Sequence, residues 1–395
     1  MDLIPAGPEP VEWPASLDVE ALLAGGFRPA PFREFVLKIA SRCDLACTYC
    51  YMYEMADQSW RDQPVRMSPA TLTRTAERIA EHAAAHDLRS VRVVLHGGEP
   101  LLVGPAGIAF AATTLRAALP PSTALDLRAQ TNGLGLTDEM ADTLAAQQIT
   151  VGISVDGDRR THDRHRRRPN GAGSYDLVRG AVHRLLDRHP AQYAGLLCTI
   201  DVASDPIEVY EGLLALQPPA VDLLLPHRTW ADPPPPGRHG QWLAAVFDRW
   251  YAAGAAETRI RFFDELIHLL LGGRSGIETI GLSRVALLVV ETDGALQQVD
   301  SLRAAYDGAI GTGRHVDRDP FDRALLHQGV VARQIGVSAL ADECRGCPVH
   351  TVCGAGYYAH RYRPGTGFRN PSAYCHDLEY LIRHVHARLA ADLAR

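Results

Sequence analysis

Three cysteines lie close together near the start of the chain, in the segment Cys43-Asp44-Leu45-Ala46-Cys47-Thr48-Tyr49-Cys50. Three thiolates at this spacing can bind three irons of a small iron–sulfur cluster and leave the fourth iron open to a small molecule. The alternative is a structural zinc site that a remote histidine completes. The segment directly follows an apolar run, and ligands bind at the carboxyl ends of parallel strands, so its position favours catalysis.

A second short motif, His96-Gly97-Gly98-Glu99-Pro100, follows the next strand-like run. Adjacent glycines let a backbone approach a ligand closely, and Glu99 can accept a hydrogen bond from an amino group. Alone, this motif is typical of a turn. Its place one strand–helix unit after the cysteines favours a binding site instead.

Four further cysteines near the C-terminus are Cys344, Cys347, Cys353 and Cys375, enough to close a second metal site. A zinc knuckle is the alternative for this group. The eighth cysteine, Cys198, lies within an apolar run, and we expect it to pack as a small hydrophobic side chain.

The elements that must position these residues alternate between strand-like and helix-like patterns. Between the strands lie helical stretches such as 68–86, where Ser68 is predicted as N-cap and Pro69 as the first helical residue. Strands alternating with helices predict βαβ units and a parallel sheet. Six strands predict an α/β fold, a partial (β/α)6 barrel that is open on one side. The six apolar runs are 35–40, 91–95, 125–129, 150–155, 195–200 and 221–225.

The rest of the pattern divides the chain into four parts. Residues 1–32 are predicted as an irregular lead-in, 33–235 as the barrel, 236–284 as a helical linker region and 285–395 as a cysteine-rich domain. The boundary after the barrel follows from the proline run at 233–236. Beyond about residue 285 we expect a hairpin-like strand pair, the cysteine-rich segment and a terminal helix.

Composition indicates an ordinary globular protein: 395 residues, 46% hydrophobic and 22% charged, with a net charge of −6. That balance gives no reason to expect nucleic acid as a partner. Neither a secretory signal nor an apolar run of about 18 residues is evident, so we expect a cytoplasmic protein without a membrane anchor. Thiols stay reduced there, which favours metal ligation over disulfides. Lys38 is the only lysine, which we interpret as a composition bias.

The two motifs together resemble the radical S-adenosylmethionine (SAM) superfamily, whose members carry such a cysteine loop after the first strand and a GGEP-type motif after the second. Later landmarks, Gln130-Thr131-Asn132-Gly133 and Ser154-Val155-Asp156-Gly157, also resemble it. Together these features cover about residues 34–230. The resemblance implies that SAM binds the open iron and, after one-electron reduction, yields a 5′-deoxyadenosyl radical that abstracts hydrogen from a substrate.

The same resemblance implies roles for single residues. The methionine part of SAM is expected at Gly97, Gly98 and Glu99, and Ser154 and Arg166 match positions that contact SAM in relatives. For Arg166 the alternative is a solvated basic run at 159–168. The remaining residues that we assign to the cofactor are Asn132 and Tyr49, and Tyr49 either lies against the adenine or packs.

The C-terminal cysteines resemble the SPASM extension of peptide-modifying radical SAM enzymes, which in complete form has seven cysteines and two auxiliary clusters. Here Val299 and Tyr357 stand where the family has cysteine. We therefore predict one auxiliary cluster and two 4Fe–4S clusters in all. Asp300 follows Val299, and an aspartate at that place is the proton acceptor in formylglycine-forming relatives. The alternative is that Asp300 caps the helix-like segment 302–306.

The segments 291–302, 356–363 and 367–375 resemble FxsB-type radical SAM/SPASM maturases, and with the N-terminal half this similarity spans nearly the whole chain. It implies a precursor-peptide substrate with a leader, a reducing partner such as flavodoxin or ferredoxin, and a cyclophane crosslink from an aromatic carbon to a β-carbon. Two alternatives remain: another maturase such as a formylglycine-forming oxidase, and a non-catalytic metal scaffold. The aromatic residues Tyr357, Tyr358, His360 and Tyr362 either line a leader surface or form core.

Overall fold

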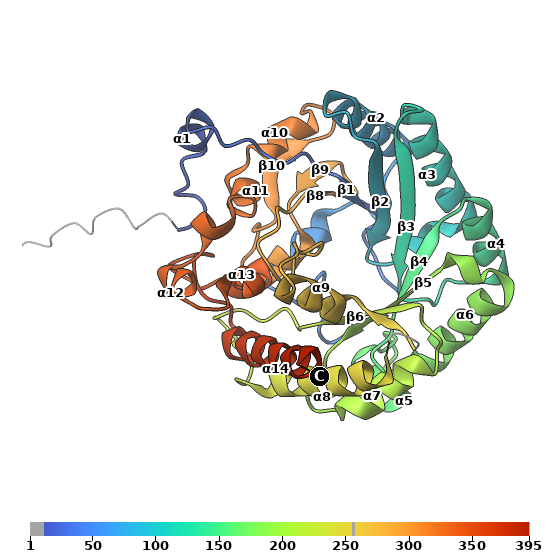
Figure 1. The fold of residues 1–395 in the computed structure, drawn as a ribbon. Coiled ribbons are helices and arrows are strands. Elements are labelled where there is room, and N and C mark those ends of the chain that lie inside the picture. Colours follow the sequence, from blue (N-terminus) through green and yellow to red (C-terminus); the bar gives the residue numbers. More distant parts are fainter. Residues whose placement is uncertain (1–11, 255–256, 395) are drawn as a thin grey trace, which may run out of the picture.

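A computed structural model describes residues 12–254 and 257–394, and it contains one curved ten-stranded sheet (Figure 1). The strand order is β10-β9-β8-β1-β2-β3-β4-β5-β6-β7. Strands β1 to β6 pair in parallel with their neighbours, which confirms the predicted partial barrel. Their bounds are β1 Glu34–Ala40, β2 Ser90–Gly97, β3 Ala124–Thr131, β4 Thr150–Ser154, β5 Tyr193–Thr199 and β6 Ala220–Leu224.

The connecting helices lie on the outside of the curved sheet (Figure 1). The helix α2 begins as predicted, because the Ser68 side chain accepts a hydrogen bond from the Thr71 amide and Pro69 is its first residue. Its buried positions recur at helical spacing and join the main core, which anchors the helix on the sheet. The outer helices are α2 Pro69–Ala85, α3 Gly104–Ala118, α4 Asp138–Ala146, α5 Arg159–His165, α6 Tyr175–Arg188 and α7 Pro206–Leu214.

The C-terminal part extends the same sheet. Strand β8 (Leu287–Val290) pairs in parallel with β1, and β9 (Ala295–Gln297) and β10 (Gly311–His315) follow it as antiparallel strands. At the other edge β7 (Arg259–Ile260) pairs in parallel with β6. The predicted hairpin therefore exists, and it is joined to the barrel by main-chain hydrogen bonds. The four-part division of the chain stays a prediction.

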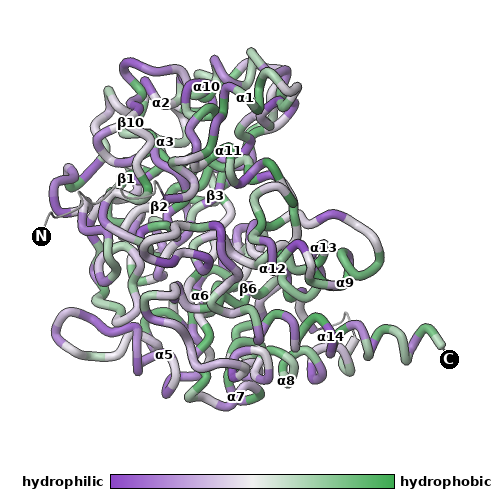
Figure 2. Tube along the Cα trace, turned by 90° about the vertical axis from the view of Figure 1, so that its left-hand side faces the viewer, coloured by the Kyte–Doolittle hydropathy of each residue, from purple (hydrophilic) through white to green (hydrophobic). Residues whose placement is uncertain are grey.

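The remaining helices cover the open side of the barrel and the cysteine-rich region (Figure 1). The terminal helix is confirmed, and its last turns project from the body with both hydrophilic and hydrophobic residues (Figure 2). These helices are α8 Arg238–Ala253, α9 Arg261–Leu270, α10 Phe321–Leu325, α11 Gln328–Ala332, α12 Asp342–Arg345, α13 His350–Cys353 and α14 Cys375–Leu393.

The lead-in and one apolar helix differ from the sequence prediction. The lead-in is not wholly irregular, because Asp18 caps a short helix, α1 (Val19–Ala24); residues 1–11 lie outside the described residues. One stretch, Pro100–Ala118, is long and apolar enough to cross a membrane by length and composition. In the fold it includes α3, whose residues Ile108, Ala111 and Leu115 are buried in the main core, so we interpret it as a core helix.

A buried arginine ties the cysteine loop region to the C-terminal hairpin. The Arg303 side chain is fully buried and forms ion pairs with Asp57 at 2.7 Å and Glu291 at 2.9 Å. Both carboxylates are also buried, and Arg303 makes a further hydrogen bond to Gln297. Three buried charges are stable only while all of them are paired.

We therefore expect Arg303→Met to lower the free energy of unfolding by about 3–5 kcal/mol, because it leaves two buried carboxylates without their cation. Urea denaturation of purified protein measures this change. The matched control is Arg383→Met, which removes an exposed helical pair with Glu379 and should cost at most about 0.5 kcal/mol. Equal losses in the two variants would contradict the assignment.

Candidate active site

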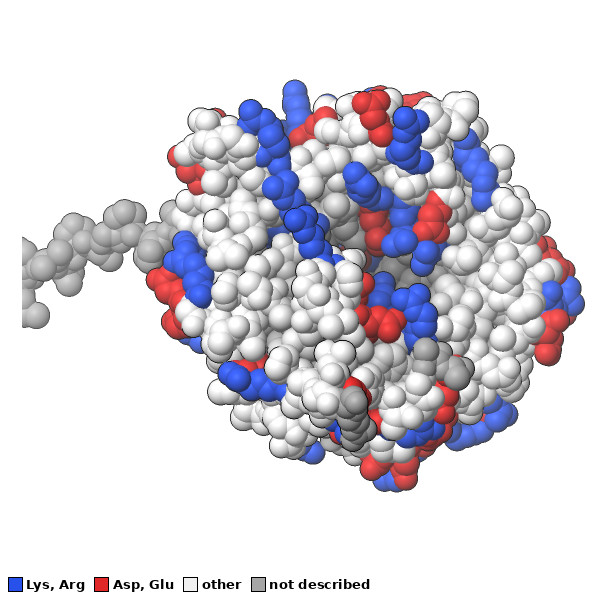
Figure 3. Space-filling view, viewed as in Figure 1, with Lys and Arg blue, Asp and Glu red and all other residues white. Residues whose placement is uncertain are grey.

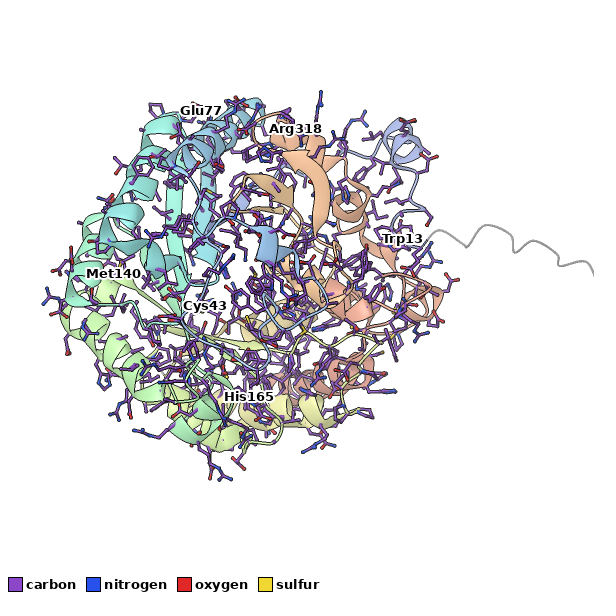
Figure 4. The ribbon with its side chains drawn as sticks, turned by 180° about the vertical axis from the view of Figure 1, so that it is seen from behind. Trp13, Cys43, Glu77, Met140, His165 and Arg318 are labelled. Atoms are coloured by element: carbon purple, nitrogen blue, oxygen red, sulfur yellow. The ribbon has the colours of Figure 1, made fainter. Side chains whose placement is uncertain are left out.

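The first cysteine group lies in the loop after β1, inside the curve of the sheet, where Figure 4 shows Cys43. The loop is fastened to the end of α5 by main-chain hydrogen bonds, from the Ala46 amide to the Arg167 carbonyl and from the Thr48 amide to the His165 carbonyl. The Thr48 hydroxyl also contacts His165 Nδ1 at 2.8 Å. The loop that carries the three thiols is thus held in place from the far side of the barrel.

Burial makes these thiols poor acids in the absence of a metal. It raises the pKa of Cys43 to about 12 and the pKa of Cys47 to about 11, and it raises the pKa of Cys50 as well. Thiolates are the form that binds metal, so cluster binding must drive their deprotonation. A positively charged neighbour helps, because Arg166 lowers the pKa of Cys47 and Cys50.

The glycines of the second motif lie directly against the cysteine loop. The Gly98 amide donates to the Ala40 carbonyl and the Glu99 amide donates to the Arg42 carbonyl, each at 2.9 Å. A Cβ on Gly97, whose φ is 145°, would lie 1.9 Å from the Ala40 oxygen. Glycine is therefore required here because the main chain of the cysteine loop packs directly against the main chain of the motif.

Glu99 is buried and joins three segments. Its carboxylate accepts hydrogen bonds from the Asn132 amide at 2.7 Å, the Thr131 hydroxyl at 2.6 Å and the Leu101 amide at 3.0 Å. Desolvation raises the pKa of Glu99 to about 7 although these donors lower it. Glu99 therefore positions the loop after β3, and the predicted contact to an amino group of SAM stays a prediction.

The loop after β3 and the end of β4 complete this side of the site. The side-chain nitrogen of Asn132, Nδ2, lies 3.6 Å from Cys43 Sγ and donates a hydrogen bond to the Asp44 carboxylate at 2.7 Å. Ser154 ends β4, and its hydroxyl accepts from Gln130 at 3.0 Å. The predicted residues at the carboxyl ends of four successive parallel strands thus lie at the same edge of the sheet.

Tyr49 and Arg166 belong to one buried network. The Tyr49 hydroxyl donates to Asp156 and accepts from Arg166 Nη1 at 3.0 Å. Arg166 is 8% exposed, which rules out the solvated basic face that was the alternative. Its Nε is buried without a hydrogen-bond partner among the described residues. A buried, unpaired guanidinium donor beside the cysteine loop suits the carboxylate of a bound ligand such as SAM.

Lys38, the only lysine, lies at the end of β1 and pairs with Asp300. Its ammonium is fully buried, 2.5 Å from Asp300 Oδ2, and also contacts His96 Nδ1 at 3.3 Å and Met52 Sδ at 3.4 Å. The neighbours Lys38, Arg303 and His96 lower the pKa of Asp300 below its usual value, against the effect of burial. The second oxygen, Oδ1, has no hydrogen-bond partner among the described residues.

This contact overturns two sequence interpretations. Asp300 is not a helix cap: it is the first residue of the 3₁₀ helix Asp300–Ala304, and its side chain makes no capping hydrogen bond. Composition bias alone does not explain Lys38, because its ammonium forms a buried ion pair with Asp300. The sequence does contain a sign of this role. Only one of the 40 basic residues is a lysine, and that lysine lies near the end of the strand that leads into the cysteine loop.

The four C-terminal cysteines line one cavity of about 230 Å³. Burial raises the pKa of Cys344 to about 11 and the pKa of Cys353 to about 12, and the Arg361 guanidinium opposes this rise. Arg361 is buried nearby and donates to the carbonyls of Gly354, Ala355 and Gly356. Four thiols around one cavity with a cation beside it fit a four-cysteine cluster. Cys198, as expected, is 1% exposed and packs in the main core.

The aromatic segment between these cysteines is mostly interior. Tyr358, His360 and Tyr362 are at most 7% exposed, which supports the core interpretation for them. Tyr357 is partly exposed and lies at the centre of a ring cluster with His227 at 5.7 Å and His360 at 5.4 Å. Tyr51, which follows Cys50, contacts the same His227 ring at 5.3 Å. Aromatic rings therefore fill the space between the two cysteine groups.

Residues 37–197 match the Radical SAM superfamily. These residues have the radical SAM fold. The match covers the strands β1 to β5 and the site residues on them, and it agrees with the prediction of SAM and iron–sulfur clusters as cofactors.

Proteins of known function are similar over most of the chain. A serine-type anaerobic sulfatase-maturating enzyme of Bacteroides thetaiotaomicron is 25% identical over 299 residues, 68% of this chain and 69% of that protein. A cysteine-type anaerobic sulfatase-maturating enzyme of Clostridium novyi is 24% identical over 331 residues, 80% of this chain and 85% of that protein. The FxsB-type resemblance is a finer assignment that these similarities leave as a prediction.

Two solved structures share the fold. Native anSMEcpe with bound AdoMet superimposes with a TM-score of 0.78 at 19% identity, over 92% of this chain and 99% of that chain. Streptococcus suis SuiB bound to the precursor peptide SuiA gives 0.56 at 13% identity, over 89% and 77%. These likenesses confirm the fold class, an α/β partial barrel with a cysteine-rich extension.

We predict about eight irons per chain after anaerobic reconstitution, because seven cysteines provide ligands for two 4Fe–4S clusters. Iron analysis should fall to about four when Cys344 and Cys347 are both replaced by alanine. Cys198→Ala is the matched control and should keep the full content. An iron content clearly above eight, or one that the double replacement leaves unchanged, would contradict the two-cluster assignment.

A second prediction concerns the Lys38–Asp300 pair. Asp300→Asn should lower the free energy of unfolding by about 3 kcal/mol, because it leaves a buried ammonium unpaired, and adding Lys38→Met should restore most of the loss. The folded pKa of Asp300 lies below its usual value of 3.8, so the stabilisation is complete above that pH. It is lost as pH falls through the lower folded pKa.

Urea denaturation at neutral and acidic pH measures both effects. The difference between wild type and Asp300→Asn should shrink only below about pH 4. A double variant that is less stable than Asp300→Asn would show that the two side chains are not coupled.

Proposed function

We propose that the protein oxidises a residue of a ribosomally made precursor peptide and joins an aromatic ring carbon to a nearby β-carbon. The observation that carries this proposal is Asp300, whose Oδ2 is paired with the only lysine and whose Oδ1 has no hydrogen bond among the described residues and lies 3.7 Å from Arg303 Nε. These two cations lower the pKa of Asp300, and an ionised carboxylate is a proton acceptor.

Short contacts connect Asp300 with the last cysteine of the loop. The Lys38 ammonium, which is 2.5 Å from Asp300 Oδ2, lies 5.8 Å from the centroid of the Tyr51 ring, and Tyr51 directly follows Cys50 in the chain. A substrate bound there would have the hydrogen-abstracting side and the proton-accepting side close together.

Each group of residues has a role in this proposal. The thiols Cys43, Cys47 and Cys50 hold the cluster, and the Arg166 Nε and the residues around Glu99, Asn132 and Ser154 form the SAM side. Bound SAM supplies the 5′-deoxyadenosyl radical that abstracts a hydrogen atom from the peptide. Lys38 and Arg303 keep Asp300 ionised, and Asp300 takes the proton that the reacting residue releases.

The atoms and electrons of the crosslinking reaction balance with these roles. Crosslinking breaks one β-carbon C–H bond and one ring C–H bond and forms one C–C bond, so a hydrogen atom, a proton and an electron must leave. The hydrogen atom goes to the deoxyadenosyl group and the proton to Asp300. A cluster held by Cys344, Cys347, Cys353 and Cys375 would accept the electron, and a flavodoxin- or ferredoxin-like partner would deliver the electron that starts the reaction.

A second candidate is oxidation of a serine or cysteine to formylglycine. The observation that favours it is the similarity to enzymes described as sulfatase-maturating at 24–25% identity. It needs the same hydrogen abstraction and the same proton acceptor. Val299 and Tyr357, which stand where a second auxiliary cluster would have cysteines, weigh toward the crosslinking reaction.

Tandem mass spectrometry separates the two candidates. A short peptide encoded beside this gene is co-expressed with the enzyme without oxygen, and the peptide is analysed before and after treatment with a hydrazide. Crosslinking predicts loss of two hydrogens, no hydrazide adduct and no fragmentation between an aromatic residue and the residue two positions on. A hydrazide adduct on a former serine or cysteine would establish the formylglycine reaction instead.

Asp300→Asn tests the proton-acceptor role in the same assay. We expect deoxyadenosine to form while the peptide stays at least tenfold less modified, because hydrogen abstraction does not need the carboxylate and proton removal does. The matched control is Asp317→Asn, an exposed aspartate that should leave turnover unchanged. Full peptide modification by Asp300→Asn, at normal iron content, would refute the role.

A further inference from the structure

Two histidines and an aspartate converge on the outer side of the barrel, away from both cysteine groups. His82 lies in the last turn of α2, His86 is the residue at the C-terminal cap of that helix, and Asp322 lies in the first turn of α10. Asp322 Oδ1 is 2.6 Å from His82 Nδ1 and 3.0 Å from His86 Nε2. The three ligand atoms all lie within 4.8 Å of one another.

We propose that His82, His86 and Asp322 bind one divalent transition-metal ion, of which Zn²⁺ is the best match, and that the ion clamps α2 to α10. Two nitrogen ligands four residues apart at the end of a helix plus one carboxylate form a set that zinc binds with a further position open to solvent. Ligand atoms on one tetrahedral zinc with bonds of about 2.1 Å lie about 3.4 Å apart, so Asp322 Oδ1, which contacts both rings directly here, must move away from them by roughly half to one ångström to admit the ion.

The surroundings fix the orientation of the ligands. The His82 side chain is 1% exposed, and its ring packs against Phe32, Phe35 and Phe321 at centroid distances of 5.7, 6.1 and 6.3 Å. The His86 ring lies 4.5 Å from the His82 ring. This packing holds the two rings in place before an ion binds, which lowers the entropy cost of arranging them.

One side of the group is open. His86 is 28% exposed and Asp322 is 48% exposed, so an ion and its water ligands can reach the site from solvent. In Figure 1 helices α2 and α10 lie next to each other, and Figure 4 places Glu77 of α2 and Arg318, just before α10, at the same end of the molecule. Charges of both signs are interspersed over the face in Figure 3, without one continuous acidic region. The specific ligand geometry therefore carries the proposal.

The position indicates what the ion does. Helix α2 covers the barrel, and α10 follows β10 at the end of the extended sheet. The Phe35–Phe321 contact at 5.4 Å already joins these parts beneath the histidines. A metal here adds a polar link at the rim of that apolar contact and fastens the hairpin that carries Asp300 to the barrel.

The test uses the reconstituted holoenzyme, so that the cysteines are already occupied by iron. After dialysis against micromolar zinc chloride without oxygen, metal analysis should find one zinc per chain in wild type and in His183→Ala, an exposed helical histidine used as control. His86→Ala and Asp322→Asn should each lose it, and the second variant keeps the shape of the side chain. Zinc should raise the midpoint of thermal unfolding only where it binds.

X-ray absorption at the zinc edge identifies the ligands. The proposal requires a first shell of nitrogen and oxygen at about 2.0–2.1 Å. A sulfur shell at about 2.3 Å would place the zinc on cysteines and overturn the assignment. Zinc retained by both variants, or no zinc bound by wild type, would overturn it as well and leave the group as a hydrogen-bonded contact.

Discussion

The parallel pairing of β1 with β8 is the contact on which the site depends. It runs from Glu34 opposite Leu287 to Leu37 opposite Val290. Because of it, the strand that leads into the cysteine loop and the hairpin that leads to Asp300 lie side by side, although about 250 residues separate them in the chain. Lys38 is the next residue after the paired segment, which is why its ammonium meets Asp300 directly.

Buried charge keeps this arrangement specific. Arg303 binds Asp57, from the segment after the cysteine loop, and Glu291, from the end of β8, so it fixes the hairpin against the loop. Lys38 and Asp300 form a second pair beside it. Such pairs add little net stability over apolar packing, but a wrong register would leave them unpaired at a cost of several kcal/mol. The same low-polarity surroundings strengthen the electrostatic interactions that a radical reaction site needs to hold its substrate groups.

The sequence predicted the strand–helix alternation and the position of the cysteine loop because both are local signals. Apolar runs of five to six residues mark buried parallel strands, and the thiols of Cys43, Cys47 and Cys50 are defined by spacing alone. It did not predict that β8 would extend the sheet, because strand partners are set by long-range packing. For the same reason the sequence did not predict a role for Lys38 and left a helix cap as one interpretation of Asp300. The function of both residues depends on their contact, which joins segments that are far apart in the chain. The glycines at 97 and 98 were predicted at the right place for a different reason, since backbone contact with the loop accounts for them.

The cysteine loop after β1 is proposed to hold a cluster that cleaves SAM within reach of a peptide. Formation of 5′-deoxyadenosine tests this role when the reconstituted protein is incubated with SAM and a strong reductant, with and without the peptide encoded beside the gene. Wild type should form deoxyadenosine, Cys47→Ala should form none, and the deoxyadenosine should contain deuterium when the β-carbons of the peptide carry deuterium. Absence of deoxyadenosine from wild type with its full iron content would contradict it, and unlabelled product would show that the peptide is not the hydrogen donor.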